Sequence, residues 1–169
     1  MKYTIISGTN RSGSNTLKVA KQYQELLKNK GVEATVVSLE GVDLNQKTPD
    51  WAVVEREVLV PTDKFIFILP EYNGSFPGAL KTVIDISDHR KIWPGKKALL
   101  TGISTGRAGN LRGMDHLTGA LNYLQMYVHP NKLPISSVDK LLNGIGEITD
   151  QPTLSAIDQQ LIIIDLLQI

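Results

Sequence analysis

The chain has 169 residues, of which 41% are hydrophobic and 21% are charged, with 18 Lys and Arg against 17 Asp and Glu. This length is enough for one domain with a substantial core, and the near-neutral balance disfavours a dedicated nucleic-acid binder, which normally carries a basic excess. The absence of cysteine excludes disulfides, thiol catalysis, thiolate metal sites and iron–sulfur clusters.

Apolar, β-branched runs predict five strands with helices between them. The runs are 3–6, 34–37, 65–69, 98–103 and, more weakly, 126–128. Apolar residues recur at helical spacing at Leu17, Ala20, Tyr23 and Leu27, at Leu80, Val83 and Ile84, and at Leu117, Leu121 and Leu124. Strands that alternate with helices indicate parallel βαβ units covered on both faces. We therefore predict one doubly wound α/β domain spanning residues 1–169.

Three loops that follow predicted strands are rich in glycine and small polar residues. They read "SGTNRSGSNT" from residue 7, "PEYNGSFPG" from residue 70 and "STGRAGN" from residue 104. Ligands of doubly wound folds bind beyond the carboxyl ends of the strands, where these loops meet. The three loops are therefore the candidate binding site.

The first loop has the outer glycine spacing of a nucleoside-triphosphate P-loop, at Gly8 and Gly13. Ser14 and Asn15 stand where that motif requires lysine and Ser/Thr, and the third glycine of a dinucleotide fingerprint is missing, so neither motif is present. Backbone N–H groups at a helix start, hydroxyls and Arg11 suit a terminal monophosphate. The alternative is an ordinary strand–turn–helix corner with Ser14 or Asn15 as the N-cap.

The first two loops together resemble a known family. The segment 8–16 resembles the phosphate loop of the NADPH-dependent FMN reductases, flavodoxin-like proteins that include chromate, quinone and azo-dye reductases. The stretch "PEYNGS", followed by "PGALK" and then Ile84-Asp85, resembles that family's most distinctive motif. The resemblance implies a flavodoxin-like three-layer α/β/α sandwich with a five-stranded parallel sheet in the order 2-1-3-4-5.

The resemblance also implies which residues bind FMN, with no metal and no catalytic side chain. The positions that match the FMN phosphate loop are Thr9, Arg11, Ser14, Asn15 and Thr16. Those that match the loop along the isoalloxazine ring are Pro70, Glu71, Tyr72, Asn73 and Gly74. Those that match the loop over the other edge of the ring are Ser104, Thr105 and Gly106.

The activity that the resemblance implies is hydride transfer from NADPH or NADH to flavin N5, and onward to a quinone, dye, metal oxyanion or free flavin. Two departures from the family pattern lie near the expected nicotinamide and acceptor position: Arg107 replaces a glycine, and Ile86 replaces a tryptophan that many relatives have. Arg107 could attract the 2′-phosphate of NADPH or could be a solvated loop residue, which we favour.

Two other functions remain open: a non-enzymatic flavodoxin-like electron carrier, and an FMN-binding regulatory protein without turnover. Carriers of this kind are usually strongly acidic, whereas this chain has a net charge of +1. The three histidines match no metal-ligand spacing, and Trp51 and Trp93 lie outside the three loops, so we expect all five side chains to have packing or surface roles.

The last predicted helix is apolar on more than one face from Leu161 onward. Such a surface needs covering, and relatives commonly form dimers or tetramers, so we expect a homo-oligomer. No apolar run approaches the ~20 residues of a membrane span, and the N-terminus lacks the pattern of a signal peptide. We expect a cytoplasmic protein that binds neither membranes nor nucleic acid and reduces a small-molecule acceptor.

Overall fold

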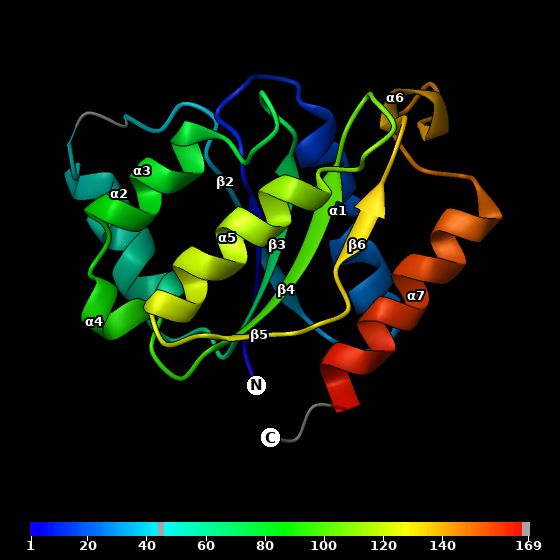
Figure 1. Ribbon diagram of the computed structural model, residues 1–169. Coiled ribbons are helices and arrows are strands. Elements are labelled where there is room, and N and C mark those ends of the chain that lie inside the picture. The colour runs from blue at the N-terminus through cyan, green and yellow to red at the C-terminus, as the bar shows by residue number, and fades with distance from the viewer. Residues whose placement is uncertain (44–45, 167–169) are drawn as a thin grey trace.

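A parallel sheet lies at the centre of the protein, between two layers of helices (Figure 1). A computed structural model describes residues 1–43 and 46–166, with side chains of the last helix described as far as residue 162. The main strands are β1 (Tyr3–Ser7), β2 (Ala34–Ser38), β3 (Lys64–Pro70), β4 (Lys97–Ile103) and β5 (Tyr127–Val128). Their order is β2-β1-β3-β4-β5, with every neighbouring pair parallel. This is the flavodoxin-like order, and the predicted fold is confirmed.

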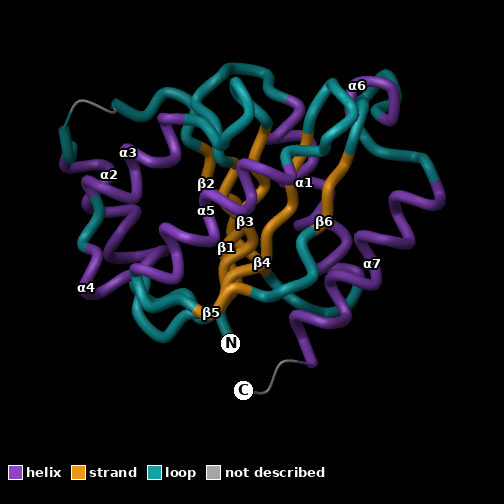
Figure 2. The backbone as a smooth tube through the Cα atoms, in the orientation of Figure 1, coloured by secondary structure: helices purple, strands orange, loops and turns teal. Residues whose placement is uncertain are grey.

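Helices cover both faces of the sheet (Figure 2). One face carries α1 (Asn15–Asn29) and α7 (Gln151–Leu166), and the other carries α2 (Pro49–Val54), the π-helical turn η1 (Glu55–Leu59), α3 (Gly78–Ile86), α4 (His89–Ile92) and α5 (Leu111–Tyr123). The short helix α6 (Val138–Leu141) lies above the carboxyl ends of the strands. The helices predicted from the apolar spacing are α1, α3 and α5, which lie in these two layers, whereas α2, η1 and α4 are not predicted.

The middle of the core is strand β3, in which all seven residues are buried. Phe65 and Phe67 face the α3–α5 layer, while Ile66 and Ile68 face α1 and α7. Trp93 packs on Phe65 with their ring centroids 5.3 Å apart, and Trp51 is also buried in this layer. The two tryptophans are packing residues, as the sequence predicts.

The fifth position of the sheet is divided between two short strands. β5 pairs with Lys97 and Ala98 at the start of β4, and β6 (Leu133–Ile135) pairs with Thr101–Ile103 at its end. Sequence analysis predicts the first strand and misses β6, which is three residues long and contains Pro134. Proline donates no ladder hydrogen bond and is tolerated here because this is the edge of the sheet.

His129, between β5 and β6, gives a testable pH dependence of stability. It is half-buried, and burial lowers the pKa of its imidazole below the ordinary value of about 6.5. The unfolded chain therefore binds more protons at acid pH, so stability falls as pH drops through about 6.5. We expect His129→Gln to reduce the loss of unfolding free energy between about pH 7.5 and about pH 5.5 in urea titrations. Exposed His89→Gln is the control, and equal pH slopes in all three proteins would contradict the prediction.

A buried polar network joins α1, β4 and α7. The Tyr23 hydroxyl donates to Gln160 Oε1 at 2.9 Å and lies 2.8 Å from Thr101 Oγ1. Gln160 Nε2 donates in turn to the carbonyls of Leu100, at 3.0 Å, and Asn131, at 3.1 Å. Burial raises the pKa of the Tyr23 phenol. The network fixes the position of α7 against the sheet.

Tyr23→Phe is expected to lower the free energy of unfolding by about 1–2 kcal/mol, because it leaves buried Thr101 and Gln160 without the hydroxyl. Urea denaturation of the variant measures this loss. The matched control is Tyr123→Phe, since the Tyr123 side chain is 88% exposed and its hydroxyl faces water. A loss of similar size in both variants would contradict the assignment.

Within residues 1–43 and 46–166, no helix combines the length and the apolar character that crossing a membrane would require. Of the apolar segment predicted at the C-terminus, Leu161 is buried and Ile162 is 44% exposed. The side chains of 163–169 lie outside the described residues, so the prediction of an all-round apolar surface there stays a prediction.

Candidate functional site

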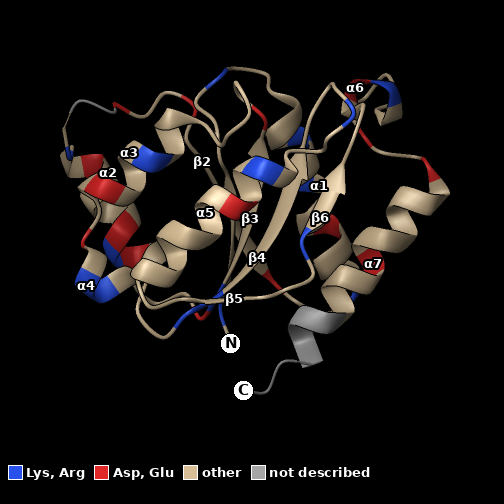
Figure 3. Ribbon diagram, in the orientation of Figure 1, with Lys and Arg blue, Asp and Glu red and all other residues tan. Residues whose placement is uncertain are grey.

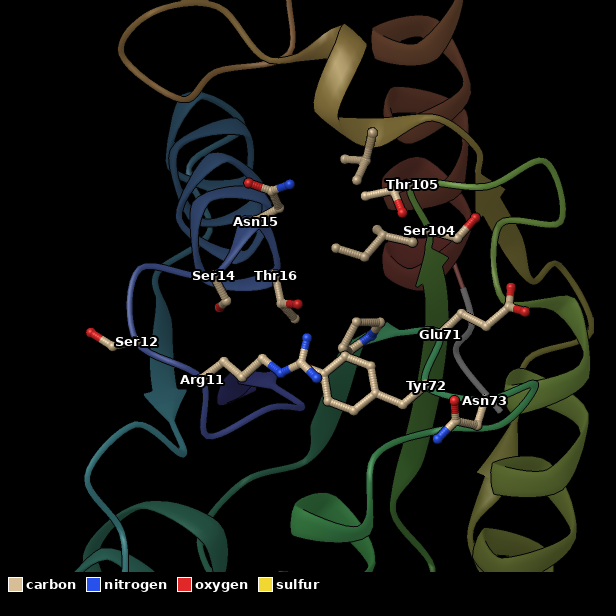
Figure 4. A pocket seen from close by; sticks show the side chains of 13 residues that line it. Arg11, Ser12, Ser14, Asn15, Thr16, Glu71, Tyr72, Asn73, Ser104 and Thr105 are labelled. Carbon is tan, nitrogen blue, oxygen red and sulfur yellow. The ribbon is translucent and has the colours of Figure 1, made fainter.

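A cleft of about 390 Å³ opens at the carboxyl ends of β1, β3 and β4 (Figure 4). Its volume lies within the range of small-molecule and cofactor sites. The lining residues are Arg11, Ser12, Ser14, Asn15, Thr16, Pro70, Glu71, Tyr72, Asn73, Ile103, Ser104, Thr105 and Val138. The cleft therefore brings together the three loops that sequence analysis singles out.

One end of the cleft is the N-terminus of α1. Ser14 is the N-cap, and its Oγ accepts the Leu17 N–H at 3.2 Å. Of the two N-cap residues that the sequence offers, Ser14 and Asn15, the structure uses Ser14. The main-chain N–H groups of 12–16 have no hydrogen-bond acceptor among the described residues. Unpaired N–H groups at the positive end of a 15-residue helix favour an anion.

The second loop forms a two-residue β-turn. Tyr72 and Ser75 exchange main-chain hydrogen bonds of 2.9 and 3.1 Å. The central residues Asn73 and Gly74 have φ of +53° and +75°, which is the type I′ geometry that the dipeptide Asn-Gly favours. The turn presents Tyr72 and Asn73 to the cleft, with Gly74 on its outer side against Arg112.

Tyr72 connects the first and second loops. Its hydroxyl lies 2.7 Å from Thr9 Oγ1, and the Arg11 guanidinium lies 4.1 Å from the centre of its ring. This cation–π contact holds Arg11 over the floor of the cleft without an ion pair to any described carboxylate (Figure 4). The guanidinium thus keeps its hydrogen-bond donors for a ligand.

The third loop is held in place by Ser104. Its Oγ donates to the Gly106 carbonyl and accepts the Gly109 N–H, both at 2.9 Å. Its main-chain N–H donates to the carbonyl of Ile135 in β6 at 3.0 Å. The loop therefore closes on itself and on β6, and its first residues form one wall of the cleft.

The structure places the predicted site residues around one cavity, apart from three. Thr9 is buried beneath the cleft, and neither Gly74 nor Gly106 lines it. Ser12, Ile103 and Val138 line the cleft and are missing from the predicted set. Ser12 belongs to the predicted loop and Ile103 ends a predicted strand, whereas Val138 belongs to α6, which no sequence pattern indicates.

Arg107 and Ile86, the two departures from the family pattern, lie outside the cleft lining. The Arg107 side chain is exposed, which agrees with the solvated interpretation. Of the histidines, His116 Nδ1 lies 2.9 Å from Ser75 Oγ on the outer side of the second loop, and His89 is exposed.

Comparison with known proteins decides the family. Residues 1–140 match the family model described as NADPH-dependent FMN reductase. The chain belongs to this family. It is an FMN-dependent oxidoreductase that uses a nicotinamide cofactor, which confirms the resemblance and the enzyme class predicted from the loops.

Relatives and solved structures agree with this family assignment. The chain is 33% identical to an NAD(P)H-dependent FMN reductase from Pseudomonas aeruginosa, covering 95% of this chain and 91% of the relative. It is 30% identical to a quinone reductase from Pseudomonas putida, covering 87% and 84%. The flavoenzyme NAD(P)H:(acceptor) oxidoreductase FerB from Paracoccus denitrificans shares the fold, with a TM-score of 0.75, 24% identity and coverage of 97% and 95%.

The donor set of the cleft fits the FMN of this reductase family. One end has a cation and unpaired N–H groups at a helix start, which suits a phosphate. The other end has Pro70, Ile103 and Val138, whose apolar surfaces suit a flat ring system. No metal is needed for this fit, and the described residues contain no group of three or more metal-ligating side chains.

Proposed function

We propose that the cleft holds FMN with its phosphate at the N-terminus of α1 and its isoalloxazine ring between the second and third loops. The observation that carries this proposal is the set of unpaired N–H groups of 12–16 beside Arg11. Phosphate-binding residues would be Arg11, Ser14, Asn15 and Thr16, while buried Thr9 would support them through its contacts with Tyr72 and the Arg11 N–H. Residues along the ring would be Pro70–Asn73, Ser104 and Thr105, while Gly74 and Gly106 would shape the two loops from outside the cleft lining.

Bound FMN would supply hydride and electron transfer at N5. The protein's part is to position the ring and to exclude water from one side. Reduction places negative charge near N1 and O2, where main-chain amide donors of the second or third loop would stabilise it. No side-chain acid or base is required in this scheme, and none of the described residues that line the cleft is a histidine.

The acceptor that we propose is a quinone or a similar small, flat molecule. Curated relatives named quinone reductase support this class. The charge distribution disfavours the electron-carrier alternative, because acidic and basic side chains are interspersed over the helices (Figure 3) and the net charge is +1. A carrier that docks a basic protein partner would present a concentrated acidic face.

The test is an absorption spectrum of the purified protein after incubation with FMN and removal of the excess. Retained flavin that NADPH bleaches under anaerobic conditions, and that a benzoquinone restores, would support the reductase. Retained flavin that NADPH leaves oxidised would favour the carrier or the regulatory protein. The same titration with NADH compares the two hydride donors.

We also propose that the protein forms a homo-oligomer, supported by the exposed Ile162 directly after buried Leu161. Sedimentation velocity at micromolar concentration measures the species, and a monomer would overturn this proposal. The choice between dimer and tetramer and the cytoplasmic location stay predictions from the sequence.

A further inference from the structure

Asn110 stands where the third loop enters α5, and its side chain does not cap that helix. It is the N-cap residue, with φ +60° and ψ +33°, yet its amide makes no hydrogen bond to the first turn. An N-cap asparagine ordinarily accepts a bond from that turn. Here Nδ2 donates instead to the carbonyls of Leu69, at 3.1 Å, and Pro70, at 2.9 Å.

The packing around Asn110 is built to admit this side chain. Asn110 is completely buried, and its Oδ1 has no hydrogen-bond partner among the described residues. A Cβ on Gly113 would lie 2.1 Å from Oδ1, and a Cβ on Gly102 would lie 3.0 Å from Asn110 Cβ. Two glycines therefore leave the space that directs the amide toward the end of β3.

Asn110 also holds the next residue of the second loop, Glu71. The Glu71 N–H donates to the Ile103 carbonyl at 2.9 Å, which continues the β3–β4 ladder. Glu71 Oε2 accepts the Asn110 main-chain N–H at 3.3 Å, at the positive end of α5. Figure 4 shows the Glu71 side chain directed away from Arg11 and Tyr72. The side-chain amide of Asn110 thus donates to the main-chain carbonyls of residues 69 and 70, and its main-chain N–H donates to the Glu71 carboxylate.

We infer that Asn110 is a positioning residue for the flavin loop: it fixes the path of residues 69–71 and keeps the Glu71 carboxylate on the α5 side, out of the ring site. The inference rests on the proposed FMN site. A carboxylate turned into the cleft would repel the negative charge that the ring gains on reduction, and would so destabilise the reduced form. At about 6 Å and an effective dielectric constant of about 40, as in an open cleft between protein and water, this would weaken binding of reduced FMN, relative to oxidised FMN, by roughly tenfold.

Asn110→Gly tests the first half of this inference in the protein without FMN. Glycine accepts the left-handed backbone conformation of residue 110 and removes only the side-chain amide. We expect the Glu71 amide to exchange with deuterium at least about tenfold faster than in the wild type, because its strand end is no longer held. Asn110→Asp keeps the shape of the side chain and removes the two Nδ2 hydrogens that bond the carbonyls of residues 69 and 70, so we expect the same faster exchange. Wild-type exchange in both variants would overturn the inference, whether or not the protein binds FMN.

The second half is tested on the FMN-loaded protein. Glycine at position 110 keeps the main-chain N–H that Glu71 accepts, so the carboxylate is released only through the loosened path of residues 69–71. We expect Asn110→Gly to lower the midpoint potential of FMN by about 30 mV, the equivalent of tenfold for a two-electron couple. Adding Glu71→Gln to Asn110→Gly should reverse the shift, which a loss of packing alone would not do. The control is Gln125→Gly, at an exposed residue of φ +63° beyond the other end of α5. An unchanged potential, no reversal by Glu71→Gln, or an equal shift in the control would overturn the role assigned to Glu71.

Discussion

Gly102→Ala is expected to prevent folding or to lower the free energy of unfolding by about 4 kcal/mol or more. A Cβ at this position in β4 would lie 2.2 Å from the Gly109 carbonyl oxygen and 3.0 Å from Met114 Cε. The nearer contact is with backbone, which cannot rotate away as a side chain can. Relief would require the third loop to lift from β4, and that loop forms one wall of the cleft. Soluble yield and urea denaturation measure the effect.

Gly119→Ala is the matched control for this substitution. Gly119 is an exposed residue of α5, and a Cβ there would meet nothing within 4 Å. Alanine in an exposed helix interior is more stable than glycine by roughly 0.5–1 kcal/mol, so the control should gain stability by that amount. If Gly102→Ala remained within about 1 kcal/mol of the wild type, the close approach of the third loop to β4 would be contradicted.

The sheet and its helices are predictable because they depend on local patterns. A run such as 65–69, apolar throughout and rich in β-branched and aromatic residues, is typical of a strand buried on both faces. The helical spacing from Leu17 to Leu27 marks the buried face of α1. β6 depends on something else. Its three residues become a strand because β4 offers unpaired groups beyond the end of β5, and that partner lies about thirty residues away.

The same distinction separates the parts of the candidate site. The three loops are predictable because each follows a strand at the carboxyl edge of the sheet. Val138 and Asn110 are not, since each reaches its place through contacts with distant segments. The Val138 N–H donates to the Ser104 carbonyl, and the Asn110 side chain donates to the carbonyls of Leu69 and Pro70. In the sequence, an asparagine in a glycine-rich loop indicates an ordinary turn residue. Only the burial of Asn110 and its hydrogen-bond partners indicate the role that we infer.

Arg11→Ala is expected to raise the dissociation constant for FMN between about tenfold and about a hundredfold. The guanidinium faces the cleft 4.1 Å from the Tyr72 ring centre, free of any described carboxylate, and charge-assisted bonds to phosphate are worth roughly 1.5–3 kcal/mol. Quenching of flavin fluorescence during titration measures the constant. The loss should shrink as salt rises, because mobile ions screen a partly exposed charge.

Riboflavin, which has the ring of FMN without the phosphate, separates two roles of Arg11. If the guanidinium binds phosphate, Arg11→Ala weakens FMN binding and leaves the dissociation constant for riboflavin within about twofold of the wild-type value. If its main role is to hold the Tyr72 ring, both ligands lose affinity equally, and the phosphate site at α1 is contradicted. Arg107→Ala removes the same charge from an exposed position outside the cleft, and should change neither constant. Only a loss that is specific to both Arg11 and FMN places the phosphate beside the N–H groups of 12–16.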